Sequence, residues 1–305
     1  MDIVVVGDLN VDLVLTGLSA LPAYRELRVA KGMRFVLGGS SGIFACNAAR
    51  LGASIGFVGK VGEDEFGDFL QRRMEESGVD ASHLARDPSQ QTGICISMSF
   101  PEEYAMASYA GIRETFRVED VDFNYLKTAR HLHMSGFYLL PAMWAGAVRL
   151  FREAKQAGLS TSLDPDHDSS GKWDGGIRDL LPYVDFFLPN EHESLSITGA
   201  DDIETAAARL RGLAATTVIK RGAEGVLVAS GSTTVFAPAF RITPVDTTGA
   251  GDSFNAGFIF QFLQGAPLEQ CIRWGNACGA LSTQALGGTE GFPTPAEVQR
   301  FLDGR

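Results

Sequence analysis

The sequence predicts an α/β protein with a mainly parallel central sheet, helices on both faces of that sheet and a small β lid. Short β-branched runs alternate with segments of helical periodicity along most of the 305 residues. The 35 glycines lie at strand ends rather than in a repeat, which is typical of tight turns between strands and helices. We interpret residues 1–305 as a single domain, because no linker, internal repeat or low-complexity stretch interrupts them.

The predicted elements of the amino-terminal third are a strand at Ile3–Val6, a helix at 41–51, a strand at 55–58 and a helix at 65–77. Gly52 and Gly78 close the two helices, because glycine readily adopts the left-handed conformation that ends a helix. The residues that follow Gly78 are expected to form a turn.

The alternation continues through a strand at His131–Met134, a helix at 143–157, strands at Ser160–Leu163 and 186–188, a helix at 203–212 and a strand at 217–220. The last third is helical, with helices predicted at Ala250–Leu263, 268–285 and 295–302. Two segments, about 13–36 and about 93–116, are strand-like but lack intervening helices. We expect these two segments to form the antiparallel lid.

Composition excludes several classes of partner. The formal net charge is −11 and Lys and Arg do not cluster, so neither nucleic acid nor an anionic membrane surface is expected to bind. The first apolar run is too short for a signal peptide, and no stretch approaches the ~18 apolar residues of a membrane span. We therefore expect a cytoplasmic protein. The cysteines form no CxxC pair and are expected to be buried free thiols: Cys46, Cys95, Cys271 and Cys278.

The strongest local motif is DTTGAGDSF, which spans residues 246–254 and leads directly into an apolar helix. Its small residues would let the backbone amides of Gly249, Ala250 and Gly251 converge on an anion at the helix start, where the helix dipole also favours negative charge. Asp252 would lie beside that anion and could accept a proton from an attacking hydroxyl. The alternative is that Asp252 only complements the helix dipole and that the glycines only serve a turn.

Two other phosphate-binding patterns do not fit. GAGDSF is close to GxGxxG, but another helix follows it instead of a strand that ends in an acidic residue. Gly59-Lys60 and Gly171-Lys172 lack the Ser or Thr that completes a Walker A loop.

DTTGAGDSF resembles the signature of the ribokinase-like, or PfkB, family of carbohydrate and nucleoside kinases. Other segments resemble that family in the same order: GDLNVD at 7–12, GGS at 38–40, GKVGEDEFG at 59–67, NEHE at 190–193 and KRGAEG at 220–225. The likeness covers essentially the whole chain. It implies a ribokinase-like fold and an ATP- and Mg²⁺-dependent transfer of a phosphoryl group to a sugar-like hydroxyl.

The resemblance also implies roles at the acceptor and phosphoryl sites. Asp252 would be the general base, and the amides of Gly249, Ala250 and Gly251 would form the anion hole. Asp12 would bind sugar hydroxyls through both carboxylate oxygens. Gly38 and Gly39 would let the sugar approach the backbone, and the lid would close over it and exclude water.

For the nucleotide, the resemblance implies that Lys220, Gly222, Gly225 and Asn276 lie along ATP. Asn190 and Glu193 would hold Mg²⁺, mostly through water. Asp246 and Thr248, with the loop at 285–291, would line a site for a monovalent cation such as K⁺.

Each of these residues also has an ordinary structural interpretation. Asp12 could be an acidic turn residue, Asn190 a helix N-cap, Glu193 a helix N-terminal charge, and Asn276 a partnered polar residue inside a helix. His131 and His133 share a strand face, but no further ligand is identifiable, so an ordinary strand is favoured over a metal site. Trp173 is interpreted as a packing anchor.

The family pattern fails at three positions near the acceptor. Ile43 stands where the family usually has an Asn that contacts the sugar, Ser40 stands where ribokinases have Lys, and Arg113 lies in a Gly-Ile-Arg stretch that is usually Gly-Ala-Asn. Arg113 could approach a carboxylate, a phosphate or a second subunit, and is interpreted as a solvent-exposed lid residue. These departures put ribose in doubt as the acceptor.

Three hypotheses follow. The first is an ATP-dependent kinase for a primary hydroxyl of a sugar, sugar acid, polyol or nucleoside. The second is a non-catalytic sugar sensor on the same scaffold, against which the intact Asp252 argues. The third is a nucleoside kinase, which the apolar Ile43 and Phe44 would permit. Similar proteins often form dimers through the lid, so a homodimer is also implied.

Overall fold

The computed structural model describes residues 1–100 and 104–304, and within them the strands form two sheets. The larger sheet has nine strands in the order β13-β12-β11-β10-β9-β8-β1-β4-β5. Its strands are β1 (Ile3–Val6), β4 (Ile55–Gly62), β5 (Asp80–Asp87), β8 (His131–Met134), β9 (Ser160–Leu163), β10 (Phe186–Phe187), β11 (Thr216–Lys220), β12 (Gly225–Ser230) and β13 (Thr233–Pro238).

The strands from β5 to β11 pair in parallel, whereas β11, β12 and β13 pair antiparallel. The mainly parallel sheet predicted from the sequence is therefore confirmed. Three strands were not predicted. The expected turn after Gly78 gives way to β5, and the edge hairpin β12–β13 turns tightly between Ser230 and Thr233, where Gly231 has a φ of 55°.

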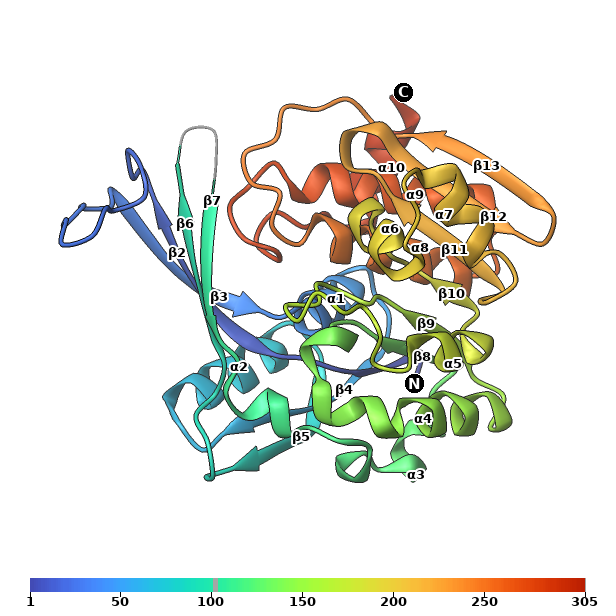
Figure 1. Cartoon of the computed structure of the whole chain (residues 1–305), viewed down its shortest axis with the longest axis horizontal. Coiled ribbons are helices and arrows are strands. Elements are labelled where there is room, and N and C mark those ends of the chain that lie inside the picture. The colour runs from blue at the N-terminus through green and yellow to red at the C-terminus, as the bar shows by residue number, and fades with distance from the viewer. Residues whose placement is uncertain (101–103, 305) are drawn as a thin grey trace.

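Helices cover both faces of this sheet because its strands are apolar on both sides (Figure 1). In β1, Ile3 and Val5 face one buried cluster while Val4 and Val6 face the other. The first cluster includes α1 (Ser40–Arg50), α2 (Glu65–Glu76), α8 (Ala250–Leu263), α9 (Leu268–Ser282) and α10 (Pro295–Asp303). The second includes α3 (Phe123–Leu126), α4 (Trp144–Gln156), α5 (Ile177–Leu180), α6 (Glu191–Thr198) and α7 (Ile203–Leu210).

The smaller sheet has four strands in the order β3-β2-β6-β7 and stands apart from the helical body (Figure 1). Its strands are β2 (Asn10–Thr16), β3 (Gly32–Gly38), β6 (Ile94–Ser99) and β7 (Tyr104–Tyr109). Both segments predicted to form a lid contribute to it, although residues 101–103 of the second lie outside the described residues. The sheet is mixed rather than wholly antiparallel, because β2 and β6 pair in parallel.

The strands of the smaller sheet extend further toward the large sheet than the sequence predicts. β2 begins at Asn10 and β3 ends at Gly38, and these two residues face each other in the antiparallel register. The proposed acceptor residues Asp12 and Gly38 therefore lie on paired strands where the two sheets meet.

No helix in the described part of the chain is long and apolar enough to cross a membrane. Cys46, Cys271 and Cys278 are buried, Cys95 is partly buried, and all four are free thiols. Trp173 packs edge-on against Tyr138 and His192, as expected of a packing anchor.

Candidate active site

A cavity of about 710 Å³ lies where β9, β10 and β11 end and helix α8 begins. Ligands of open α/β sheets bind at the carboxyl ends of the strands, and a cavity of this size accommodates a nucleotide-sized ligand. Many of the residues predicted from the sequence line it: Ser40, Asn190, Glu193, Lys220, Gly222, Gly225, Ala250, Gly251, Asp252 and Asn276. The structure thus brings together residues that are far apart in the sequence.

Helix α8 begins with backbone amides that face this cavity. Gly249 precedes the helix with a φ of 71°, and a Cβ there would lie 2.7 Å from the Gly288 Cα. The Ala250 amide donates to the Thr247 carbonyl at 3.2 Å. Among the described residues, the amides of Gly251 and Asp252 have no acceptor. An anion at this helix start would therefore find free amides at Gly251 and Asp252 rather than at Ala250.

Asp252 lies in the first turn of α8 and is 8% exposed. Burial raises the pKa of its carboxyl group well above the usual value; Asp164 raises it further, and Lys220 opposes the shift. A carboxylate with a raised pKa is a stronger base than an exposed one. The arrangement suits a group that takes a proton from a hydroxyl.

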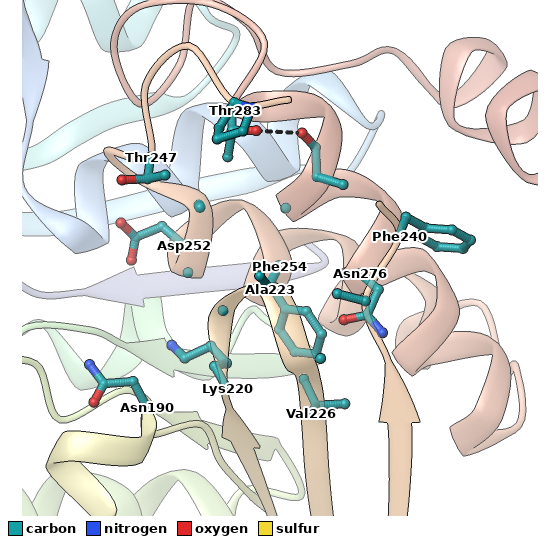
Figure 2. Close-up of a pocket in the computed structure, with 18 of the residues that line it drawn as sticks. Asn190, Lys220, Ala223, Val226, Phe240, Thr247, Asp252, Phe254, Asn276 and Thr283 are labelled. Carbon is teal, nitrogen blue, oxygen red and sulfur yellow. Dashed lines mark hydrogen bonds between the residues drawn. The ribbon is translucent and has the colours of Figure 1, made fainter. Parts of the chain in front are cut away.

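The cavity has a polar end and an apolar end. Figure 2 shows Asp252, Lys220 and Asn190 at one end, and Phe254, Val226 and Phe240 toward the other. Asn276, from α9, lies beside the apolar end, and its Nδ2 donates to the Pro238 carbonyl at 3.1 Å. Gly222 and Gly225 flank this region on the turn between β11 and β12. Such a division matches a ligand with a charged part and a flat apolar part.

Asn190 and Glu193 form a capping box at the start of α6. The Asn190 side chain accepts the Glu193 amide at 2.9 Å, and the Glu193 carboxylate accepts the Asn190 amide at 2.7 Å. The structural interpretation of both residues is therefore realised in the fold. Both side chains also line the cavity, which keeps them within reach of a ligand.

The residues present fit a hydrated magnesium ion. Asp164, Asp166, Glu193 and Asp252 all line the cavity. Burial raises the pKa of Glu193 to about 8, and the charge of Asp164 adds to this shift. No group of three or more ligating side chains converges on one point among the described residues, so contact through water fits better than direct ligation.

On the acceptor side, a chain of hydrogen bonds runs from Arg113 to Asp12. Arg113 Nη1 donates to Asn10 Oδ1 at 3.0 Å, and Asn10 Nδ2 donates to Asp12 Oδ1 at 2.7 Å. Burial raises the pKa of Asp12 to about 6. A carboxylate oxygen can accept more than one hydrogen bond, so both Asp12 oxygens can still contact a ligand, and the contact through both oxygens stays a prediction.

The interpretation of Arg113 as a solvent-exposed residue is wrong. The side chain is 6% exposed, and its Nη2 donates to Ser108 Oγ at 3.2 Å. It lies in the short 3₁₀ helix Gly111–Thr115 and links the end of β7 to the start of β2. A single arginine in a polar loop gives no sign of such burial in the sequence.

The double glycine packs closely against two carboxylates, the partly buried Asp12 and the buried Asp8. A Cβ at Gly38 would lie 2.2 Å from Asp12 Oδ1, and a Cβ at Gly39 would lie 3.0 Å from Asp8 Oδ2. Gly39 also has a φ of 86°, which side chains rarely adopt. Asp8 Oδ1 accepts the Ser41 amide at 3.0 Å at the start of α1.

Ser40 and Ile43 have different surroundings. Ser40 Oγ donates to Asp166 Oδ2 at 2.5 Å at the edge of the cavity. Ile43 is buried against residues 247–251, the predicted anion loop, where a Cβ at Gly249 would lie 3.2 Å from its Cγ2. Phe44 is also buried and stacks on His133. The apolar side chains of Ile43 and Phe44 therefore pack against other protein residues.

Asp246 joins the two loops proposed to hold a monovalent cation. Its Oδ1 accepts the Thr248 amide at 2.9 Å, and its Oδ2 accepts the Gly287 amide at 2.9 Å. The predicted residues are thus neighbours of the loop at 285–291. Through these two contacts, Asp246 ties the anion loop to the loop at 285–291.

The buried histidines form hydrogen bonds with serines. His131 contacts Ser160 and Ser162, and His133 contacts Ser162 and Ser135, all within 2.8 Å. These contacts agree with the ordinary-strand interpretation.

Sequence reasoning missed the acidic residues Asp8, Asp164 and Asp166, and it missed Asn255. Asp164 and Asp166 directly follow β9, and Asp8 follows β1 within two residues. Polar residues just after a buried parallel strand lie at the edge that binds ligands. That position was the available signal, because both strands were predicted.

The comparisons with known proteins agree with this geometry. Residues 1–295 match the pfkB family carbohydrate kinase profile. The chain belongs to the pfkB family of carbohydrate kinases. The resemblance noted in the sequence and the ribokinase-like fold are therefore confirmed.

Relatives of this pfkB kinase share most of its length. It is 31% identical over 281 residues to the 2-dehydro-3-deoxygluconokinase of Bacillus subtilis, covering 87% of this chain and 86% of the relative. It is 29% identical over 269 residues to the ATP-dependent ribose-1-phosphate kinase of Halopiger xanaduensis, covering 88% and 87% of the two chains. The crystal structure of ribokinase from Thermotoga maritima superposes with a TM-score of 0.87 at 26% identity, covering 99% of both chains.

Proposed function

We propose that this carbohydrate kinase transfers the γ-phosphoryl group of ATP to a primary hydroxyl of a sugar or sugar-like acceptor. Asp252 is the general base, and the amides at the start of α8 form the anion hole. The observation that carries the proposal is the position of Asp252 beside unpaired amides at the polar end of a nucleotide-sized cavity. The ATP-dependent ribose-1-phosphate kinase among its relatives supports the choice of donor.

In the proposed reaction, the acceptor oxygen attacks the γ-phosphorus in line with the bond to the β–γ bridging oxygen. Asp252 takes the hydroxyl proton as the new O–P bond forms. The old O–P bond breaks, and its electron pair stays on the terminal phosphate of ADP. The amides of Gly251 and Asp252 stabilise negative charge on the transferring group.

The rest of the cavity positions the nucleotide. The apolar end between Phe254, Val226 and Phe240 receives the base, and Asn276, Gly222 and Gly225 lie along it. Mg²⁺, when bound, neutralises phosphate charge, and Asn190 and Glu193 hold it through water. A K⁺ ion beside Asp246 and Thr248 would order the anion loop, and turnover in KCl compared with choline chloride tests this part.

The acceptor binds between Asp12, Gly38, Gly39 and Ser40, with the four-stranded sheet as its lid. Closing of that lid would exclude water, which competes with the hydroxyl for the phosphoryl group. Ile43 and Phe44 are buried in the protein and give no particular support to a nucleoside acceptor, but a cytidine kinase is among the relatives, so nucleosides remain to be tested. Sugar acids and neutral sugars both remain acceptors to test, since one relative is a 2-dehydro-3-deoxygluconokinase.

An ADP-release assay on a panel of acceptors tests the proposal: 2-dehydro-3-deoxygluconate, ribose, ribose 1-phosphate, fructose, adenosine and cytidine. Turnover with at least one sugar is expected. Binding of a sugar with no turnover on any acceptor would favour the non-catalytic sensor instead.

The role of Asp252 is tested by Asp252→Asn, which keeps the shape of the side chain but removes the base. We expect kcat to fall by roughly 10²–10⁴-fold, the usual contribution of a positioned base. Affinity for ADP should change little, because the amides and the apolar end remain. Asp179→Asn, at an exposed position of α5 outside the cavity lining, is the acidic control. Near-wild-type turnover in Asp252→Asn contradicts the assignment.

Two broader features complete the proposal. Large apolar side chains are exposed on the four-stranded sheet and its loops, including Met33, Met106 and Tyr109, and we propose that this surface pairs two subunits. Light scattering tests it, since a particle of monomer mass at micromolar concentration would contradict it.

We also propose a cytoplasmic location, where ATP and free thiols persist.

A further inference from the structure

A buried ammonium group lies at the polar end of the cavity. Lys220 is the last residue of β11, and its backbone amide donates to the Pro189 carbonyl at 2.8 Å, next to the start of α6. Among the described residues that line the cavity, only Lys220 and Arg241 carry a permanent positive charge. Arg241 lies in an exposed stretch of chain between β13 and α8, whereas the Lys220 side chain is 13% exposed.

Two side chains from different elements hold this ammonium. Lys220 Nζ donates to Asp164 Oδ2 at 2.5 Å and to Asn255 Oδ1 at 3.5 Å. Asn255 Nδ2 in turn donates to the same Asp164 oxygen at 2.6 Å. Asn255 lies on α8 one turn after the proposed base, so the helix that carries the base also holds the ammonium.

The ammonium lies beside the anion loop. A Cβ built on Gly251 would lie 3.3 Å from Lys220 Nζ. Figure 2 shows the end of the Lys220 side chain directed between Asp252 and Asn190. A lysine ammonium has three N–H donors, and its acceptors among the described residues are Asp164 and Asn255. One donor is left for a ligand at the polar end.

Stability alone is a weak reason for this arrangement. A buried ion pair often contributes no more to folding than a well-packed apolar pair, because both charges must leave water. Burial on its own lowers the pKa of an ammonium group, but Asp164 and Glu193 outweigh burial and raise the pKa of Lys220. The group therefore keeps its charge in a cavity that also holds four carboxylates, where a polyphosphate needs a cation.

We propose that Lys220 is a further catalytic residue, whose ammonium donates to an oxygen of the transferring phosphoryl group. Asp164 and Asn255 are positioning residues that hold the ammonium beside the amides of Gly251 and Asp252. Negative charge on the phosphoryl oxygens is then met by the amides on one side and by a fixed cation on the other. This inference depends on the proposed function of the cavity.

The test compares Lys220→Met, Lys220→Arg and a matched control, Lys155→Met. Lys155 forms an ion pair with Asp185 at 2.7 Å, but neither residue lines the cavity. Lys220→Met should lower kcat by roughly 10²–10³-fold, as expected when one stabilising donor is lost from an anion site. Lys220→Arg should recover part of the loss, and Lys155→Met should stay within about threefold of wild type.

Comparing the affinities for ADP and for an ATP analogue distinguishes the loss of a contact to the γ-phosphoryl group from a general loss of structure. Calorimetry with ADP and with the β,γ-imido analogue of ATP requires neither turnover nor an acceptor. In Lys220→Met the analogue should bind roughly 10- to 100-fold more weakly, the equivalent of one hydrogen bond to a charged group. ADP affinity should change by less than about threefold. An equal loss for both nucleotides overturns the proposal.

The double variant Lys220→Met/Asp164→Asn tests the structural alternative, because it removes both charges of this ion pair and so does not leave Asp164 as a carboxylate without its ammonium. If Lys220 only neutralises Asp164, the double variant should regain turnover. If Lys220 meets the phosphoryl group, kcat should stay as low as in Lys220→Met, even though stability to urea recovers. Asp164→Asn alone should lower kcat less than Lys220→Met and leave the KM of the acceptor unchanged.

The two proposals fail in different ways. Absence of turnover by the wild-type enzyme on every acceptor, or full activity in Asp252→Asn, overturns the proposed function. A wild-type enzyme that turns over and depends on Asp252, combined with normal kcat and normal analogue affinity in Lys220→Met, overturns only the role of Lys220.

Discussion

Helices α1 and α8 begin in the same way but present opposite surfaces to a ligand. Each follows a glycine with positive φ, Gly39 at 86° and Gly249 at 71°, and neither glycine has a side chain to cap the helix. Each helix also starts beside the proposed substrates. The difference lies in what the rest of the fold places against the free amides.

At α1, the protein supplies its own anion. Asp8, from the segment after β1, accepts the Ser41 amide at 3.0 Å and is fully buried beneath Gly39. Burial raises the pKa of Asp8 to about 6, Arg113 opposes this shift, and Asp166 adds to it. A second anion placed there would meet this carboxylate, so the start of α1 suits the hydroxyls of an uncharged acceptor group.

At α8, no side chain in the described part of the chain caps the amides, so under the proposed function the substrate supplies the negative charge. The nearest carboxylate on that helix, Asp252, lies within the first turn and faces the cavity. A glycine before a helix is therefore not in itself an anion site. What decides is whether a buried carboxylate from another element already occupies the amides.

The sharpest test of this comparison is a Cβ at each glycine. In Gly249→Ala the Cβ would lie 2.7 Å from the Gly288 backbone at a φ of 71°, so the anion loop must shift. We expect kcat to fall by roughly 10²–10³-fold, as when an anion-site donor is lost. In Gly39→Ala the backbone shift falls on the acceptor side, so the acceptor KM should rise more than kcat falls. Steady-state kinetics on both variants measure this split, and a common loss of kcat would contradict the comparison.

The same contrast shows what the sequence could predict. The strands Ile3–Val6 and His131–Met134 were predicted with their observed bounds, because buried parallel strands are short apolar runs between turn residues. The start of α8 was predicted because small residues, an acidic residue and an apolar helix are contiguous there. These patterns are local, so a single sequence is enough to recognise them.

What failed depends on contacts between distant segments. The sequence does not show that Asp8 caps α1, since an acid after a strand is as often exposed. The partner of Lys220 is 56 residues earlier in the chain. Arg113 is buried because Asn10 and Ser108 reach it from β2 and β7. In the edge hairpin, the exposed β13 lacks the apolar signal of a buried strand, whereas the buried β12 carries that signal in its apolar residues and was overlooked.

The cap at α1 is tested by stability. Asp8→Ala leaves the buried Ser41 amide without an acceptor, and the free energy of unfolding should fall by about 1–3 kcal/mol. Asp8→Asn keeps an acceptor oxygen and should lose less. Asp252→Asn should not lose stability, because it removes a buried carboxyl group whose raised pKa makes ionisation unfavourable to folding. Urea unfolding at pH 7 measures all three.

The pH dependence of the same variants gives a second measurement. The pKa of Asp8 is about 6 in the folded protein, against roughly 3.9 for an unperturbed aspartate. Between these values the folded state binds more protons, so the unfolding free energy falls as the pH rises through this window. Asp8→Asn should flatten that fall between pH ~4 and ~6, leaving the similar contribution of Asp12. If the unfolding free energy of Asp8→Asn falls with pH as steeply as that of the wild type, the pKa of Asp8 is not raised by folding, and this prediction is wrong.

The smallest expected effect concerns Arg113, which acts on the acceptor through Asn10. In Arg113→Ala, Asn10 Oδ1 loses its donor, so the amide no longer holds Asp12 in one orientation. The acceptor KM should rise by about 10-fold, the equivalent of one hydrogen bond, while kcat and the ATP KM stay close to wild type. The exposed Arg152 on α4 supplies the control, Arg152→Ala. A rise confined to acidic acceptors such as 2-dehydro-3-deoxygluconate would mean that Arg113 turns to meet the ligand itself. An equal rise for neutral sugars places its action on Asp12, since the orientation of that carboxylate matters to every hydroxyl it binds.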